Sequence, residues 1–264
     1  MTNLSLLGIN TETPGFYDDP FFIKFEKQNP YFLNEYNYFV TDKQYDTNYL
    51  SQAKHKINTI IKILFDELKK TNRKGACIDI STILMKILEK ENIWCCQFGG
   101  CLTQKFPKTT GIQTNYFYLI DNSRSFSTPH AWIYAPPYKV IDLSISLQAY
   151  TQNEEKYLPP YVVEETVIAG TITAKDIVNP KYANLYNATE DDILFGFMQH
   201  KPEMQEFVMK YSPFKIDYKN VSLNYIPVGA GAGSSELENI TSINFSGMTP
   251  YELYINKIKP LIII

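Results

Sequence analysis

Apolar side chains recur with the period of an α-helix in the first half of the chain. One stripe lies within residues 49–70 and is formed by Ala53, Ile57, Ile60, Ile61, Leu64 and Leu68. A second stripe follows Cys77 at spacings typical of one buried helix face and is formed by Ile80, Ile83, Leu84, Ile87 and Leu88. The polar run 69–75 separates the two stripes. These patterns predict two consecutive amphipathic helices, the second of which begins near Cys77.

Beyond Asn92 the pattern changes to that of strands. Apolar runs with strand character follow one another at residues 93–98, 116–120, 131–135 and 138–143. The first run ends at Gly99-Gly100, and the last two flank Pro136-Pro137, which predicts a hairpin. Two helices followed by an antiparallel sheet predict an α+β fold.

The hairpin connection decides which side chains share a face of the sheet. If the connection spans Ala135-Pro136-Pro137, Tyr134 pairs with Tyr138, and His130 then lies opposite Asp142 on the same face. A two-residue Pro-Pro turn would shift the pairing by one residue and separate these side chains. Because successive prolines do not suit tight hairpin turns, we favour the longer connection.

The chain ends are less regular. Residues 1–48 combine many aromatic side chains with asparagine and proline, and are too apolar for disorder, so we expect an irregular arm packed over the main domain. Capping residues predict helices after Thr189, Pro202 and Thr249. We therefore divide the chain into an aromatic-rich arm (1–48), a central core (49–180) and a helical and β extension (181–264).

Two stretches near the end of the core have ambiguous patterns. Residues 162–168 and 172–178 fit strands, or a strand followed by a turn.

The glycine-rich run 229–235 lacks the ending of a phosphate-binding loop, and it predicts a mobile surface loop rather than a flexible lid over a cleft.

Charge excludes several kinds of partner. The chain has 25 basic and 28 acidic residues and a net charge of -3. Its overall charge balance therefore gives no strong electrostatic potential of one sign that would attract nucleic acid or a membrane surface. The first residues lack a secretory signal, and we expect a cytoplasmic protein, with export by a route without a cleaved signal left open. Only Arg73 and Arg124 represent arginine, which indicates codon bias of an AT-rich, bacterial genome.

The four cysteines are few and clustered, which favours free thiols in a reducing compartment. Zinc binding by Cys95, Cys96 and Cys101 with Cys77 or His130 is disfavoured, because adjacent cysteines are poor tetrahedral ligands and no Cys-x-x-Cys pair occurs. A redox pair among Cys95, Cys96 and Cys101 is equally disfavoured. Packing in the core is the ordinary role of such cysteines. We expect no metal site.

Cys77 stands out because a helix N-terminus favours a thiolate and can bind an oxyanion. Taken alone, a buried packing cysteine is the more frequent role for such a residue. Of the histidines, His55 falls on a polar helix face and His200 follows a helix end, which leaves His130 as the base. Asp142 interrupts an apolar strand and requires a buried partner.

Together these residues resemble a known family. Gly75-Ala76-Cys77-Ile78-Asp79, Asn92-Ile93-Trp94, His130-Ala131-Trp132 and Val140-Ile141-Asp142 are similar to the core of the transglutaminase-like cysteine superfamily, over residues 77–144. The resemblance implies a papain-like α+β core, with the catalytic cysteine at a helix N-terminus packed on an antiparallel sheet. It also implies a thioester at Cys77, with His130 as base and Asp142 orienting it.

The chain departs from that family in two places. Trp94-Cys95-Cys96-Gln97 stands where relatives often carry Pro-Ala-Arg, and residues 145–264 match nothing in the family. A side-chain oxyanion donor is also not evident, so Gln52 and Trp94 are weighed beside the Cys77 backbone N–H.

Members of the family include peptidases, deamidases, amide cross-linkers and enzymes that remove glycans from peptide amides. We expect a hydrolase, a peptidase or deamidase, acting on a protein or peptide without a cofactor. Hydrolysis is favoured over cross-linking because the chain lacks an acidic loop of the calcium-binding kind. The alternative is a catalytically silent module that binds another protein through its aromatic surface. The oligomeric state stays open.

Overall fold

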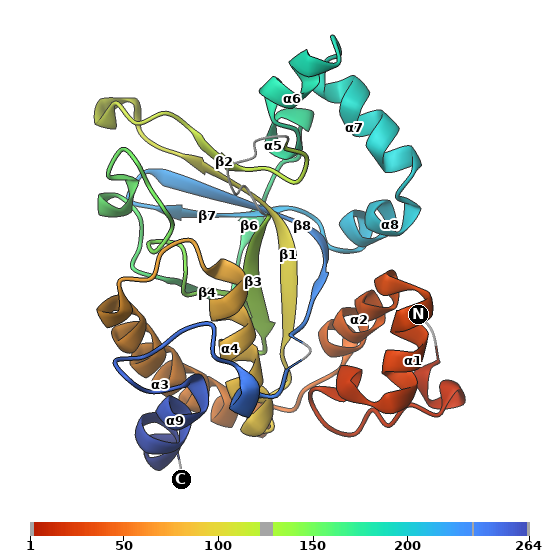
Figure 1. Ribbon diagram of the computed structural model, residues 1–264, viewed down its shortest axis with the longest axis vertical. Helices are drawn as coiled ribbons and strands as arrows, with labels where there is room; N and C mark the ends of the chain where they lie inside the picture. The colour runs from red at the N-terminus through yellow and green to blue at the C-terminus, as the bar shows by residue number, and fades with distance from the viewer. Residues whose placement is uncertain (1–2, 122–128, 234, 263–264) are drawn as a thin grey trace.

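The computed structural model describes residues 3–121, 129–233 and 235–262, and this part of the chain combines helices with one curled antiparallel sheet (Figure 1). The order of hydrogen-bonded strands is β5-β4-β3-β1-β8-β7-β6, and β2 pairs with β1. Each pair of neighbouring strands is antiparallel. The expected α+β class is therefore confirmed.

The strands are β1 (Cys96–Lys105), β2 (Asn115–Phe117), β3 (His130–Ala135), β4 (Tyr138–Asp142), β5 (Val162–Glu164), β6 (Ile168–Ala169), β7 (Phe214–Tyr218) and β8 (Val221–Gly231). The helices are α1 (Pro20–Gln28), α2 (Asn34–Asp42), α3 (Thr47–Thr71), α4 (Cys77–Lys90), α5 (Ala174–Ile177), α6 (Pro180–Leu185), α7 (Glu190–Gln199), α8 (Pro202–Lys210), α9 (Pro250–Leu253) and α10 (Lys259–Ile262).

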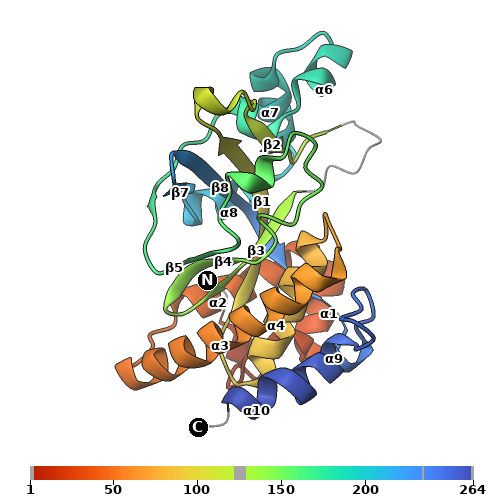
Figure 2. The ribbon, with the colours of Figure 1, turned by 90° about the vertical axis from the view of Figure 1, so that its left-hand side faces the viewer.

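Helices α3 and α4 form where the apolar stripes predict them. Asp46 caps α3 by accepting a hydrogen bond from the Tyr49 N–H, and α3 ends where Asn72 adopts a left-handed conformation. Helix α4 begins at Cys77 and lies against β3, as both views show (Figures 1 and 2). The stripe of α4 is buried in the main hydrophobic core. This packing of α4 places its first turn next to the sheet.

The N-terminal segment contains helices α1 and α2, so the expectation of an irregular arm is wrong for them, whereas its expected packing over the main domain is confirmed. Its aromatic side chains pack on one another and on the core, with the Phe16 ring edge-on to Tyr36 at 4.9 Å. Buried polar groups also join this segment to α4, because the Tyr17 hydroxyl donates to Glu89 at 2.7 Å. Burial raises the pKa of Glu89 to about 7, although Lys86 and Tyr17 oppose that rise. The segment is thus held to α4 by both apolar and polar contacts.

The centre of the sheet contains the largest departure from the sequence-based prediction. The first strand was expected to end at Gly99-Gly100, but β1 continues to Lys105, and β8 pairs with it along this length. Residues 229–231 belong to β8, so the prediction of a surface loop is wrong there, while Ser234 lies outside the described residues. Strand β8 comes from the expected 181–264 extension; the three-part division of the chain stays a prediction.

The hairpin of β3 and β4 also differs from the expected one. Ala135 pairs with Tyr138, so the connection is the two-residue Pro136-Pro137 turn, and the longer connection was a wrong prediction. The pairing shifts between Ile133 and Ala135, and Ile133 then faces Ile141. The expected Tyr134–Tyr138 pair is therefore absent. The two-residue turn shifts the expected pairing by one residue, and this irregularity shifts it by one more. A total shift of two residues leaves the same side chains on each face of the sheet.

The capping motifs of the second half are confirmed. Thr189 and Asp192 form a capping box at α7, Pro202 opens α8, and Thr249 and Glu252 form a second box at α9. The ambiguous stretch 162–168 contributes β5 and the start of β6, and 172–178 contains α5 rather than a second strand. Helices α5 to α8 cover a smaller apolar cluster built on Cys101, Ile226 and Val228.

Within the described residues, no helix has both the length and the apolar character that a membrane crossing requires.

Gly100 is predicted to be essential for the close approach of β1 and β8. A Cβ atom there would lie 2.1 Å from the Ile226 carbonyl oxygen and 2.7 Å from Cη2 of Trp132. We expect Gly100→Ala to lower the free energy of unfolding by about 3 kcal/mol, measured by urea denaturation.

Gly99→Ala is the matched control, because its Cβ would meet only the Gly229 carbonyl oxygen at 3.9 Å. Its effect should stay within about 1 kcal/mol. Equal losses for both variants would contradict the steric explanation.

Candidate active site

Cys77 is the first residue of α4, where the chain turns sharply into the helix. Gly75 has a φ of 68°, which favours glycine, and its N–H donates to the Leu147 carbonyl oxygen at 2.9 Å. Ala76 precedes the helix and supplies no side-chain cap, so the first-turn N–H groups of α4 keep their donor capacity. The Cys77 side chain is only 4% exposed but lines a pocket of about 440 Å³.

His130 and Asp142 form a buried ion pair. The His130 Nε2 atom lies 2.6 Å from Asp142 Oδ2, and both side chains are 0% exposed. His130 is the first residue of β3 and Asp142 the last of β4, so the hairpin brings them together at one end. His130 lies three residues from the Ile133–Ile141 pair on β3, whereas Asp142 lies one residue from it on β4. Their side chains therefore meet diagonally rather than directly opposite each other.

Asp142 has two further partners that the sequence did not reveal. The Tyr225 hydroxyl donates to Asp142 Oδ2 at 3.0 Å from β8, 83 residues along the chain. Ser144 donates to Oδ1 from its backbone N–H at 2.9 Å and from its hydroxyl at 2.8 Å. A serine two residues after an aspartate at a strand end is a recognisable turn signal, whereas nothing local marks Tyr225.

These contacts set the charge of the pair. Burial lowers the pKa of His130, but the Asp142 carboxylate and the Cys77 thiol raise it more, to about 10. Burial raises the pKa of Asp142, and the His130 cation and Ser144 outweigh that effect and lower it below its ordinary value. Both shifts favour an imidazolium–carboxylate pair.

The second ring nitrogen of His130 is available to Cys77. Nδ1 has no hydrogen-bond partner of standard geometry among the described residues, although the Cys77 thiol is close enough to raise the pKa of His130. Contacts of this kind are often loose before substrate binds. The structure therefore brings the thiol, the imidazole and the carboxylate together in that order.

The pocket in front of Cys77 has aromatic, amide and cationic walls. The aromatic walls are Tyr116, Phe117 and Tyr150, the amides are Asn115 and Gln148, and the cations are Arg73 and Lys74. Phe117 also packs on the His130 ring, with ring centroids 5.3 Å apart. Such walls suit a ligand that has a polar backbone and carries an apolar side chain.

Neither side chain weighed as an oxyanion donor lines this pocket. Gln52 is exposed on α3 and donates to Asn48, and Trp94 packs against Phe39, with ring centroids 5.6 Å apart. The backbone N–H groups at the start of α4 are the donors beside the sulfur. The Gln148 side chain donates to the Ser144 carbonyl oxygen at 3.0 Å and so braces the loop after Asp142.

The remaining histidines and cysteines lie elsewhere. His55 and His200 are exposed on α3 and at the end of α7, whereas Cys95, Cys96 and Cys101 are buried, and burial raises the pKa of each of these thiols. Across the part of the chain that the structure describes, no three His, Cys, Asp or Glu side chains are grouped to hold a metal ion.

No family model, curated protein or solved structure matches the chain. The resemblance to the transglutaminase-like superfamily thus depends on the short motifs around Cys77, His130 and Asp142.

We predict that His130 stays protonated well above neutral pH. A pKa raised to about 10 means that the folded protein binds this proton more tightly than the unfolded chain, where histidine has a pKa of ~6.5. The stability from this proton is therefore complete below ~6.5 and is lost as the pH rises through about 10. Imidazole ¹⁵N shifts, assigned with His130→Gln, should show a cation from pH 6 to 8.5.

Asp142→Asn is the companion variant. It removes the main group that raises the pKa, so the His130 signals should titrate at a lower pH than in the unmodified protein. A midpoint near 6.5 in the unmodified protein, or no change in the variant, would contradict the ion pair.

Proposed function

We propose that the protein is a cysteine-dependent hydrolase that cleaves an amide bond of a peptide or protein through Cys77, His130 and Asp142. One arrangement carries this proposal: a buried imidazole has one nitrogen bound to a carboxylate, while its other nitrogen is left for a thiol at a helix N-terminus. A packing cysteine does not require a buried ion pair beside it, because desolvating two charges is costly.

The proposed reaction starts from an ion pair of the Cys77 thiolate and the His130 imidazolium, in which Nδ1 already carries the thiol proton. The sulfur then attacks the amide carbonyl carbon, and the oxyanion accepts hydrogen bonds from backbone N–H groups of the first turn of α4. When the tetrahedral intermediate collapses, the C–N bond breaks and His130 returns the proton to the leaving amine. The products of this half are the free amine and a thioester at Cys77.

Water completes the cycle. His130 removes a proton from a water molecule, whose oxygen attacks the thioester carbonyl carbon. Collapse breaks the C–S bond, releases a carboxylic acid, and restores the pair of the Cys77 thiolate and the His130 imidazolium. Asp142 stays ionised throughout and holds the imidazole through Nε2, while Tyr225 and Ser144 keep the carboxylate in place. These steps use no metal or organic cofactor.

The pocket walls support a peptide or protein as substrate. Its amide side chains and cations can bind backbone carbonyls and carboxylates, and its aromatic walls can cover an apolar side chain. A papain-like, transglutaminase-like core is part of the same proposal, with the nucleophile on a helix and the other two residues on neighbouring strands. Free thiols also suit the cytoplasm, where we place the protein.

The proposal is tested by acyl-enzyme formation with p-nitrophenyl acetate, followed by mass spectrometry of the cysteine-containing peptides. We expect acetylation at Cys77, because it lines an open pocket, and none at Cys95, which is 0% exposed. His130→Ala should lower the acylation rate by about 10²- to 10⁴-fold, because the general base is lost.

His55→Ala is the matched control, since this exposed histidine lies away from the pocket. Equal labelling of Cys77 and Cys95, or no effect of His130→Ala, would instead favour a silent binding module. Acyl-enzymes trapped from lysate then identify the substrate. Products formed in H₂¹⁸O distinguish hydrolysis, which adds ¹⁸O to the acid, from transfer to an amine, which does not.

A further inference from the structure

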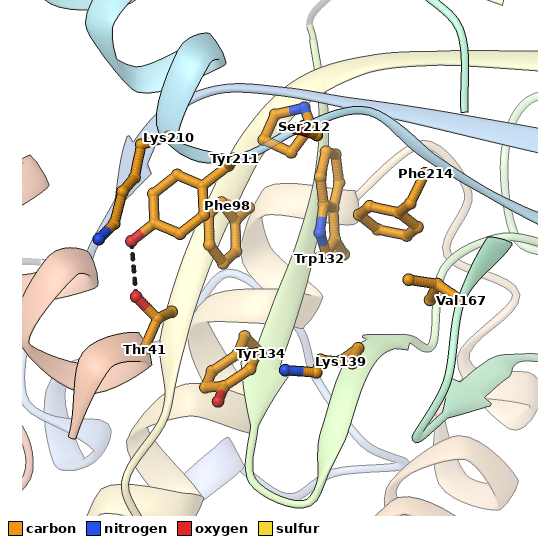
Figure 3. Close-up of a pocket in the computed structure, with 11 residues that line it drawn as sticks. Thr41, Phe98, Trp132, Tyr134, Lys139, Val167, Lys210, Tyr211, Ser212 and Phe214 are labelled. Carbon is orange, nitrogen blue, oxygen red and sulfur yellow. Dashed lines mark hydrogen bonds between the residues drawn. The ribbon is translucent and has the colours of Figure 1, made fainter. Parts of the chain in front are cut away.

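A second pocket lies on the sheet surface away from Cys77. Aromatic rings from β1, β3, β7 and the segment that joins α8 to β7 form its walls, and we call it the aromatic pocket (Figure 3). These rings belong to Phe98, Trp132, Tyr134, Tyr211 and Phe214. Its volume is about 330 Å³, which is enough for a small one-ring ligand.

The rings that form these walls pack on one another. Phe98 and Trp132 are nearly parallel, at 13° with centroids 6.1 Å apart, and Phe214 meets Trp132 edge-on at 6.2 Å. A hydrogen bond of 2.8 Å between Thr41 and the Tyr211 hydroxyl fixes one wall (Figure 3). Flat walls of this kind favour an aromatic guest.

Trp132 brings an unpaired polar group to this pocket. Its side chain is 0% exposed, and its Nε1 atom has no hydrogen-bond partner within the described residues. The indole nitrogen lies on the side of the ring that faces Phe98 and Tyr134 (Figure 3). A buried donor without an acceptor is costly, and an oxygen acceptor supplied by a ligand would satisfy it after a small movement of the neighbouring rings.

The charges at the pocket are positive. Lys139 lies over the Tyr134 ring at 5.6 Å, is exposed, and forms no ion pair with a described residue. Lys210 is already paired with Asp42 at 2.6 Å. Among the described residues, no aspartate or glutamate lines the pocket. The free cation is therefore Lys139, and its natural complement is an anion.

We infer that the aromatic pocket binds a small aromatic carboxylate that also carries an oxygen acceptor. The ring packs against the aromatic walls, the carboxylate contacts the Lys139 ammonium group, and the second oxygen accepts from Trp132 Nε1. Cys77, His130 and Asp142 do not line this pocket. The inference therefore does not depend on the proposed hydrolase activity being correct.

The test uses 4-hydroxyphenylacetate as the probe and the two indole N–H signals of the full chain as the readout. The chain has two tryptophans, and Trp94→Phe assigns their signals. We expect a saturable shift of the Trp132 signal and no shift of the Trp94 signal, because Trp94 lies outside the pocket. No saturable shift, or equal shifts of both signals, would overturn the inference.

Two comparisons test the charged contact and the acceptor separately. Lys139→Gln should raise the Kd of 4-hydroxyphenylacetate about 5-fold and leave that of 4-hydroxyphenylacetamide unchanged, because the amide has no charge to lose. Lys259→Gln is the matched control, since Lys259 lies 5.8 Å from the Tyr254 ring outside the pocket.

4-Methylphenylacetate keeps the charge and lacks the acceptor, so it should bind more weakly and move the Trp132 signal less. Equal affinities for acid and amide would overturn the anionic part of the inference, as would equal effects of the two lysine variants. Equal affinity for the methyl compound would overturn the role of the indole N–H. Cys77→Ala should change none of these values, which separates failure here from failure of the proposed function.

Discussion

The buried contact between His130 and Asp142 constrains the rest of this structure. Two charges removed from water are stable only when each finds partners that replace the lost hydration. Asp142 has them in the imidazolium, the Tyr225 hydroxyl and two donors of Ser144. These partners come from β3, β8 and the loop after β4, so the sheet must be assembled correctly before Asp142 has all of them.

Close packing of β1 against β8 provides that assembly. Gly100 leaves the space that the Ile226 carbonyl and the Trp132 ring occupy. Trp132 in turn contacts the rings of His130 and Tyr225, at 6.3 Å and 5.1 Å. The same indole therefore forms a wall of the aromatic pocket and a support for the ion pair. Packing in one region thus fixes geometry in the other.

Local patterns in the sequence predicted the parts of the fold whose signals are local. Helix α4 shows one apolar stripe because one face is buried, and Thr189 marks the start of α7 by its capping chemistry. Strand β8 was missed because its middle is buried on both faces, which removes the alternation, and because it ends in a glycine-rich run. The shared face of His130 and Asp142 was expected from the wrong turn, and a compensating irregularity preserved it. Tyr225 depends on long-range pairing that no local pattern encodes.

The place of β8 in the sheet has a consequence for biosynthesis. Strand β1 is made early, but its neighbour on one side is encoded more than a hundred residues later and arrives only after α8 and β7 have formed. Until then one edge of β1 is open, which is an aggregation hazard for a growing chain. Asp142 also lacks its phenolic partner during this interval. Asp142 consequently gains its full set of hydrogen-bond partners only after the ribosome has released the late strand.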